Sequence, residues 1–153
     1  MFKPLLAAGA LSALLILSGC LFSGEPAYAE YRLSHRESGF ELLGFIRMDS
    51  MDDCESRRQR VIAGMTKSSD GWRASSAECK PAMPERYVKL FDNAPIQATY
   101  IALTRGRGAD ERDARLVFFG VPSSVTQKYC PRISEQLKRN YSGKITCIQG
   151  TVG

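Results

Sequence analysis

The chain has 153 residues, and 21 Lys or Arg against 16 Asp or Glu give it a formal net charge of +5. This length fits one domain with an appendage, and an apolar content of 44% excludes a disordered or collagen-like chain. A single His excludes a metal site built on two histidines and leaves little room for catalysis by His. The odd count of five Cys indicates that one cysteine differs in role from the other four.

The start of the chain has the composition of an export signal. Lys3 is the first charged residue, and an uncharged apolar run extends from Leu5 to Leu17. A positive start followed by such a run is typical of a secretory signal peptide, and a spanning helix would need about 18 or more apolar residues. If the run is extended through Phe22 it comes close to that length, which leaves an uncleaved anchor as an alternative.

The apolar run ends in Leu17-Ser18-Gly19-Cys20. In these residues the chain resembles the bacterial lipoprotein precursors, whose lipobox is an aliphatic residue, a small residue, Gly or Ala, and then Cys. The resemblance covers the first 20 residues. It implies that residues 1–19 are a removed signal peptide and that Cys20 carries fatty acyl chains such as palmitate, two or three of which give stable anchoring. Because Leu21 and not Asp follows, it also implies the outer membrane, with the protein facing the periplasm.

A second cleavage motif lies a few residues downstream. Ala27-Tyr28-Ala29 before Glu30 fits the A-x-A site of an ordinary signal peptide, and cleavage after Ala29 would give a soluble periplasmic or secreted product. With lipidation at Cys20, we expect residues 20–39 to form a flexible tether that includes the only His, His35. Residues 40–150 are then a single small domain.

The pattern of this domain predicts an α+β fold. A strand over 40–48 is followed by a helix over 51–67, with Ser50 as its N-cap and Asp53 completing a capping box. The remaining predicted elements are a strand over 72–79, a Pro-rich connection over 80–96, strands over 97–104 and 114–121, a helix from Ser123 or Ser124 that is kinked or restarted at Pro131, and a strand over 144–149.

The two ends of the domain resemble each other. Each has an apolar strand, a capped helix carrying Cys, and a strand carrying the next Cys. This weak repeat predicts helices on one face of a sheet, a two-layer sandwich in the order β-α-β-β-β-α-β with ferredoxin-like character. Of the three pairings open to four cysteines, the repeat favours the disulfides Cys54–Cys79 and Cys130–Cys147. A zinc or redox-active C-x-x-C spacing is absent.

The search for chemistry finds arginines and no catalytic set. Phosphate-loop, dinucleotide-binding and nucleophile-elbow motifs are absent, so we expect no catalytic residues, no cofactor, no metal and no enzymatic activity. Export makes nucleic acid an improbable partner. We expect an envelope-anchored lipoprotein that binds or scaffolds peptidoglycan or a protein; the alternative is an inhibitor or immunity-type lipoprotein that blocks another protein's active site with its 80–96 or 105–113 loop. The candidate partner-binding residues are Arg57, Arg58, Arg60, Arg105, Arg107 and Arg112.

Overall fold

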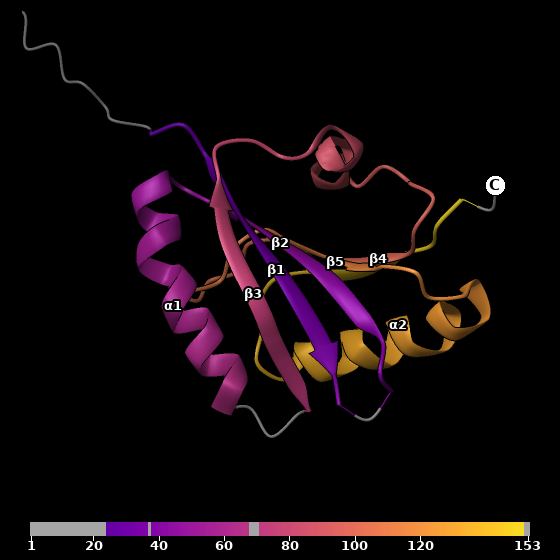
Figure 1. The fold of residues 1–153 in the computed structure, drawn as a ribbon. Coiled ribbons are helices and arrows are strands. Elements are labelled where there is room, and N and C mark those ends of the chain that lie inside the picture. Colours follow the sequence, from indigo (N-terminus) through magenta and orange to yellow (C-terminus); the bar gives the residue numbers. More distant parts are fainter. Residues whose placement is uncertain (1–23, 37, 68–70, 152–153) are drawn as a thin grey trace, which may run out of the picture.

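The structure is a computed structural model that describes residues 24–36, 38–67 and 71–151. The predicted signal peptide and Cys20 lie outside these described residues. Six antiparallel strands form one sheet in the order β3-β1-β2-β5-β4-β6, with two α-helices and one 3-10 helix packed on it (Figure 1). The elements are β1 (Ala27–His35), β2 (Glu41–Met48), α1 (Met51–Lys67), β3 (Trp72–Lys80), η1 (Glu85–Asp92), β4 (Tyr100–Leu103), β5 (Ala114–Phe118), α2 (Ser123–Lys138) and β6 (Ile145–Ile148).

The α+β class is as predicted, but the predicted order lacks strand β1. Ala27, Ala29, Tyr31 and Leu33 are buried and alternate with less buried residues, the pattern of a strand covered on one face. β1 pairs with β2 on one side and with β3 on the other, so it lies inside the sheet. The expected tether over residues 20–39 is therefore wrong for residues 27–35.

The correction extends to His35, which we expected to be a solvated linker residue. Its ring lies 4.7 Å from the ring of Trp72 and 5.9 Å from that of Phe40, centroid to centroid. Its Nδ1 is 2.9 Å from the Ser38 hydroxyl. His35 is thus part of the aromatic packing at the end of β1.

The predicted likeness of the two ends becomes a repeated unit in the structure. The first half is β1-β2-α1-β3 and the second half is β4-β5-α2-β6, and in each half the first strand lies between the other two. Antiparallel pairing of β2 with β5 joins the halves. Both predicted disulfides are confirmed: Cys54–Cys79 links α1 to β3, and Cys130–Cys147 links α2 to β6.

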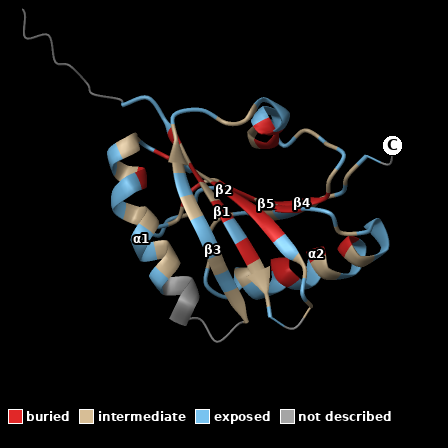
Figure 2. Ribbon diagram, in the orientation of Figure 1, coloured by how far each residue is buried: buried red, intermediate tan, exposed pale blue. Residues whose placement is uncertain are grey.

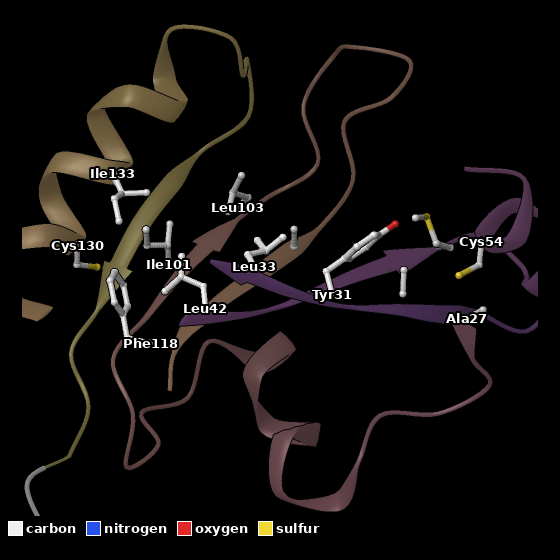
Figure 3. Close-up of a cluster of buried hydrophobic side chains, with 13 residues drawn as sticks. Ala27, Tyr31, Leu33, Leu42, Cys54, Ile101, Leu103, Phe118, Cys130 and Ile133 are labelled. Atoms are coloured by element: carbon white, nitrogen blue, oxygen red, sulfur yellow. The ribbon is translucent and has the colours of Figure 1, made fainter. Parts of the chain in front are cut away.

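The two faces of the sheet carry different cores. Beneath α1 and α2, the larger cluster includes Tyr31, Leu42 and Phe118 (Figure 3). On the opposite face, η1 and the connection around it cover Phe45 and Tyr100. Figure 2 shows the buried residues along β2, β5 and β4, whereas β3 is intermediate or exposed. The predicted two layers thus gain a partial third layer over β2, β5 and β4.

Arg115, buried in β5, attaches η1 to the sheet. Its guanidinium donates to the carbonyl oxygen of Leu90 at 2.8 Å and to that of Leu103 at 3.0 Å, and it lies 4.7 Å from the centre of the Phe91 ring. Burial lowers the pKa of Arg115. These partners give Arg115 a structural role in holding the last turn of η1.

The predicted N-cap is right for α1 and wrong for α2. The Asp53 N–H donates to Ser50 Oγ at 3.1 Å, which confirms the expected N-cap of α1. In α2 the N-cap is Pro122, with no side-chain cap hydrogen bond, so a cap by Ser123 or Ser124 is wrong. Pro131 lies inside a continuous helix from Ser123 to Lys138, so of the two expected outcomes a restart is wrong, and a kink stays a prediction.

Candidate arginine groove

A depression rich in charged side chains lies between α1, the end of β2 and the loop between β4 and β5. We call it the arginine groove. One cavity of about 190 Å³ is lined by Ile46, Met48, Arg57, Arg60, Val61, Asp110 and Arg112. A second, of about 380 Å³, is lined by Gly24, Pro26, Arg47, Met48, Asp49, Arg105, Arg112 and Asp113. Arg112 and Met48 belong to both, so the two cavities are neighbours.

Arg57 connects the helix to the loop. Its position one turn after Asp53 in α1 places Nε against the Asp53 carboxylate, while Nη1 donates to Asp110 in the loop. These hydrogen bonds raise the pKa of Arg57. Burial alone would raise the pKa of Asp53, but hydrogen bonds from Arg57 and from the Asp49 N–H outweigh it, so that pKa is lowered.

Arg105 binds Asp49, at the turn between β2 and α1, in bidentate fashion. Its two terminal nitrogens donate to the two Asp49 carboxylate oxygens at 3.0 and 2.8 Å. This pairing lowers the pKa of the Asp49 carboxyl. Asp49 and Asp53 are therefore each held by their own arginine.

Arg112 is the exception, because its side chain is 8% exposed and no carboxylate comes within hydrogen-bond distance. Its Nη1 donates to the carbonyl oxygens of Ala109 at 2.7 Å and Glu111 at 3.1 Å. Asp49 and Asp53 approach it only to 3.7 and 3.8 Å. Its Nε has no hydrogen-bond partner among the described residues. The carboxylates of Asp49 and Asp53 lie at ion-pair distance from this buried guanidinium, but neither forms a hydrogen bond with it, so Nε remains an unused donor.

The loop that carries Arg105, Arg107, Asp110 and Arg112 is held at its base. The Glu111 carboxylate accepts hydrogen bonds from the Ser142 N–H at 2.8 Å and the Ser142 hydroxyl at 2.6 Å, which lowers the pKa of Glu111. A Cβ at Gly106 would overlap that carboxylate, so this close approach requires glycine. The loop is thus a fixed wall of the groove.

The structure brings together four of the six predicted arginines. Arg57, Arg60, Arg105 and Arg112 line the groove. Arg58 turns toward β3 and pairs with Glu55 at 2.8 Å. Arg107 is exposed, and its backbone N–H donates to Ser142 Oγ.

Sequence reasoning missed Arg47 and the acidic partners of the arginines. It assigned Asp53 to the capping box of the helix and proposed no role for Asp110. The i,i+4 spacing of Asp53 and Arg57 was an available signal for one of these pairs.

Comparisons with protein-family models, curated proteins and solved structures find no match for this chain. Over residues 24–36, 38–67 and 71–151, no helix combines the length and the hydrophobicity that crossing a membrane requires. In the same part of the chain, no three His, Cys, Asp or Glu residues are grouped as metal ligands.

Proposed function

We propose that the protein is an envelope lipoprotein, held in the outer membrane through Cys20 and facing the periplasm, that acts as a non-catalytic binding or scaffolding module. The groove supports binding over catalysis because Asp49 and Asp53 are fixed by arginines and carry lowered pKa values. A general base at neutral pH would instead need a pKa near the working pH. Peptidoglycan and envelope proteins are the partners within reach of such an anchor.

The start of β1 is the observation that carries this proposal. Cleavage after Ala29 would remove the buried Ala27 and Ala29 from the core. It would also remove the pairing of Ala27 with Met48 and of Ala29 with Cys79. A chain beginning at Glu30 would start inside a central strand, whereas one beginning at Cys20 keeps the whole strand. The fold therefore favours lipobox processing over the alternative that gives a soluble product.

The groove would lie close to the membrane surface. Gly24 and Pro26 line the same cavity as Arg105 and Arg112. Gly24 is four residues from Cys20, and four residues span at most about 14 Å. A partner that uses the groove would have to reach the protein near its anchor.

The alternative, an inhibitor or immunity-type lipoprotein, is favoured by one observation. Val88, on η1 within the 80–96 connection, and Phe119 are each 54% exposed, which makes them candidate apolar contacts for another protein. We rank this function second because neither Val88 nor Phe119 lines the arginine groove.

We also propose that the fold has ferredoxin-like character. In each half an α-helix connects two strands that are separated by a third: β2-α1-β3 encloses β1, and β5-α2-β6 encloses β4. This is a split β-α-β connection, which ferredoxin-like folds share.

Acyl labelling in the producing cell tests the anchor. Cys20→Ser should abolish incorporation of radiolabelled palmitate and leave either the unprocessed precursor or a product cut after Ala29, which we expect to be degraded. The matched control Ser23→Ala, just outside the lipobox, should label like wild type. Unchanged labelling of the Cys20→Ser protein would contradict the proposed anchor.

A further inference from the structure

We infer that the arginine groove binds a side-chain carboxylate from an acidic segment of a partner protein. In the free protein, the carboxylate of Asp110 occupies the place beside Arg57 that the partner's carboxylate would take. The inference rests on the proposed binding function and assigns its site and ligand chemistry. It does not depend on how the chain is anchored.

The arginines of the groove favour the binding of an anion. Arg112 is buried without a carboxylate in hydrogen-bond contact, although it lines both cavities. Arg60, exposed on α1, lines the cavity, and no ion pair of its side chain is found among the described residues. Arg112, whose Nε has no hydrogen-bond partner among the described residues, and Arg60 thus line one cavity with donors to spare for an anion. Arginine suits this role because its planar fork matches a carboxylate.

Asp110 behaves as a replaceable occupant. Its side chain is 80% exposed, and within the described chain Arg57 is its one ion-pair partner. By contrast, Asp53 is 19% exposed and also accepts the Asp49 N–H. An incoming carboxylate could therefore take the place of Asp110 on Arg57 without disturbing the pairing of Arg57 with Asp53. An exposed ion pair contributes little stability, so this exchange has a low cost.

The wall of the cavity indicates a peptide and not a free inorganic anion. Ile46, Met48 and Val61 contribute an apolar surface beside the guanidinium groups. A peptide with an apolar side chain next to an Asp or Glu can bury that side chain there and present its carboxylate to Arg57. A phosphate group would leave this apolar surface uncovered and gain nothing from it.

The experiment uses the mature protein purified from the producing cell in a neutral detergent. The probe is a fluorescein-labelled, end-capped peptide of alternating Val and Asp, followed by fluorescence anisotropy with empty micelles as baseline. We expect saturable binding that the matched Val and Asn peptide does not show. Arg57→Gln should weaken binding at least about ten-fold, as expected for a lost hydrogen bond to a charged group.

Two further variants keep the result interpretable. Asp110→Asn should tighten binding by up to about five-fold, because the internal competitor is removed, and a gain cannot come from misfolding. Arg58→Gln, next to Arg57 but directed at β3, should bind like wild type.

Several outcomes would overturn the inference. Equal binding of the Asp and Asn peptides, or no loss with Arg57→Gln, would show that the groove does not select a carboxylate. Displacement by inorganic phosphate at the concentration at which the unlabelled peptide competes would assign a general anion site. Binding of soluble peptidoglycan fragments in preference to the peptide would assign the site to the wall. Each of these results is independent of the palmitate labelling, so the anchor and the groove fail separately.

Discussion

The two halves share one topology but are covered differently. In β1 of the first half, buried and less buried residues alternate. In β4 of the second half, all four residues are buried. The reason is η1, which covers the outer face of β4 together with β5 and β2. Strand β1 has a helix-covered core on one face and a more open surface on the other. The same position in a repeat thus requires two different sequence patterns.

This difference also explains where the arginine groove lies. The longer, more polar first half supplies α1 with Asp53 and Arg57, and the second half supplies the β4–β5 loop with Asp110 and Arg112. The groove is therefore formed where the two halves meet. Neither half forms the groove alone.

The largest effect should come from shortening β1. A chain that begins at Glu30 should lose more than about 4 kcal/mol relative to one that begins at Gly24, because it lacks two buried alanines and the first ladder pairs on both sides of β1. Urea unfolding followed by Trp72 fluorescence measures this. Equal midpoints for the two chains would contradict the role of β1 and remove the structural argument against cleavage after Ala29.

The next largest effect should come from the disulfides. Replacing either pair by alanine should cost about 3 kcal/mol on the chain-entropy model. The sequence separations are 25 for Cys54–Cys79 and 17 for Cys130–Cys147, so the first should cost only slightly more. Thermal unfolding of the two double variants under oxidising conditions makes the comparison. A difference of several kcal/mol would show that the halves are not energetically equivalent.

Strand β1 shows why part of the fold could not be predicted. In Ala27-Tyr28-Ala29 two small residues are separated by one position, which suits both a signal peptidase site and a strand with one buried face. The continuation through Tyr31 and Leu33 carries the same period of two. That longer alternation was the available signal for the strand. The apolar runs of β2 and β5 and the capped helix α1 were recognisable because each pattern has one structural meaning.

The groove illustrates a different limit. Arg57 and Arg58 are neighbours in sequence with the same chemistry, yet one faces the loop and the other faces β3. Their separation follows from the helical rotation and from which face of α1 packs on the sheet. The pairing of Arg57 with Asp110, 53 residues away, depends on the joining of the two halves. Local patterns give the candidate residues, and the topology decides which of them meet.

Two tyrosines on equivalent strands should respond with opposite signs. The Tyr31 hydroxyl on β1 is buried without a hydrogen-bond partner among the described residues, whereas the Tyr100 hydroxyl on β4 donates to the Ala94 carbonyl at 2.8 Å. Tyr31→Phe should therefore stabilise the protein by about 1 kcal/mol, and Tyr100→Phe should destabilise it by about 1 kcal/mol. Urea unfolding at neutral pH tests both. A loss of stability with Tyr31→Phe would mean that its hydroxyl is satisfied.

The buried Tyr31 hydroxyl should also make the stability of the protein sensitive to alkali. Burial raises the pKa of Tyr31 from 10.0 to about 12, with Arg58 acting in the opposite direction. The Tyr31 hydroxyl ionises near pH 10 in the unfolded chain and only near pH 12 in the folded protein. The contribution of neutral Tyr31 to stability is therefore complete below pH 10 and is lost as the pH rises from 10 to about 12. Tyr31→Phe should reduce this loss. Unfolding curves at pH 9 and pH 11 that fall equally for both proteins would contradict it.

The smallest effect should separate two neighbouring carboxylates in the first turn of α1. Asp53 pairs with Arg57, whereas Asp52 is exposed and has no ion-pair partner among the described residues. Asp53 has a pKa below its ordinary value of 3.8, so its contribution is present above that value and is lost as the pH falls below it. Asp53→Asn should cost less than about 1 kcal/mol at neutral pH and should make stability less dependent on pH below 3.8.

Asp52→Asn is the matched control, because both variants remove one charge from the same helix end. A larger effect of Asp53→Asn in urea unfolding at pH 7 and pH 3 separates the hydrogen bonds of Asp53 with Arg57 and with the Asp49 N–H from the helix dipole. The first turn of α2 has no acidic residue, so the second half has no equivalent of this titration. If the two variants lose the same stability, the helix dipole alone accounts for the contribution of both carboxylates. The two halves would then differ in how they are covered, but the pairing of Asp53 would not make the start of α1 sensitive to acid.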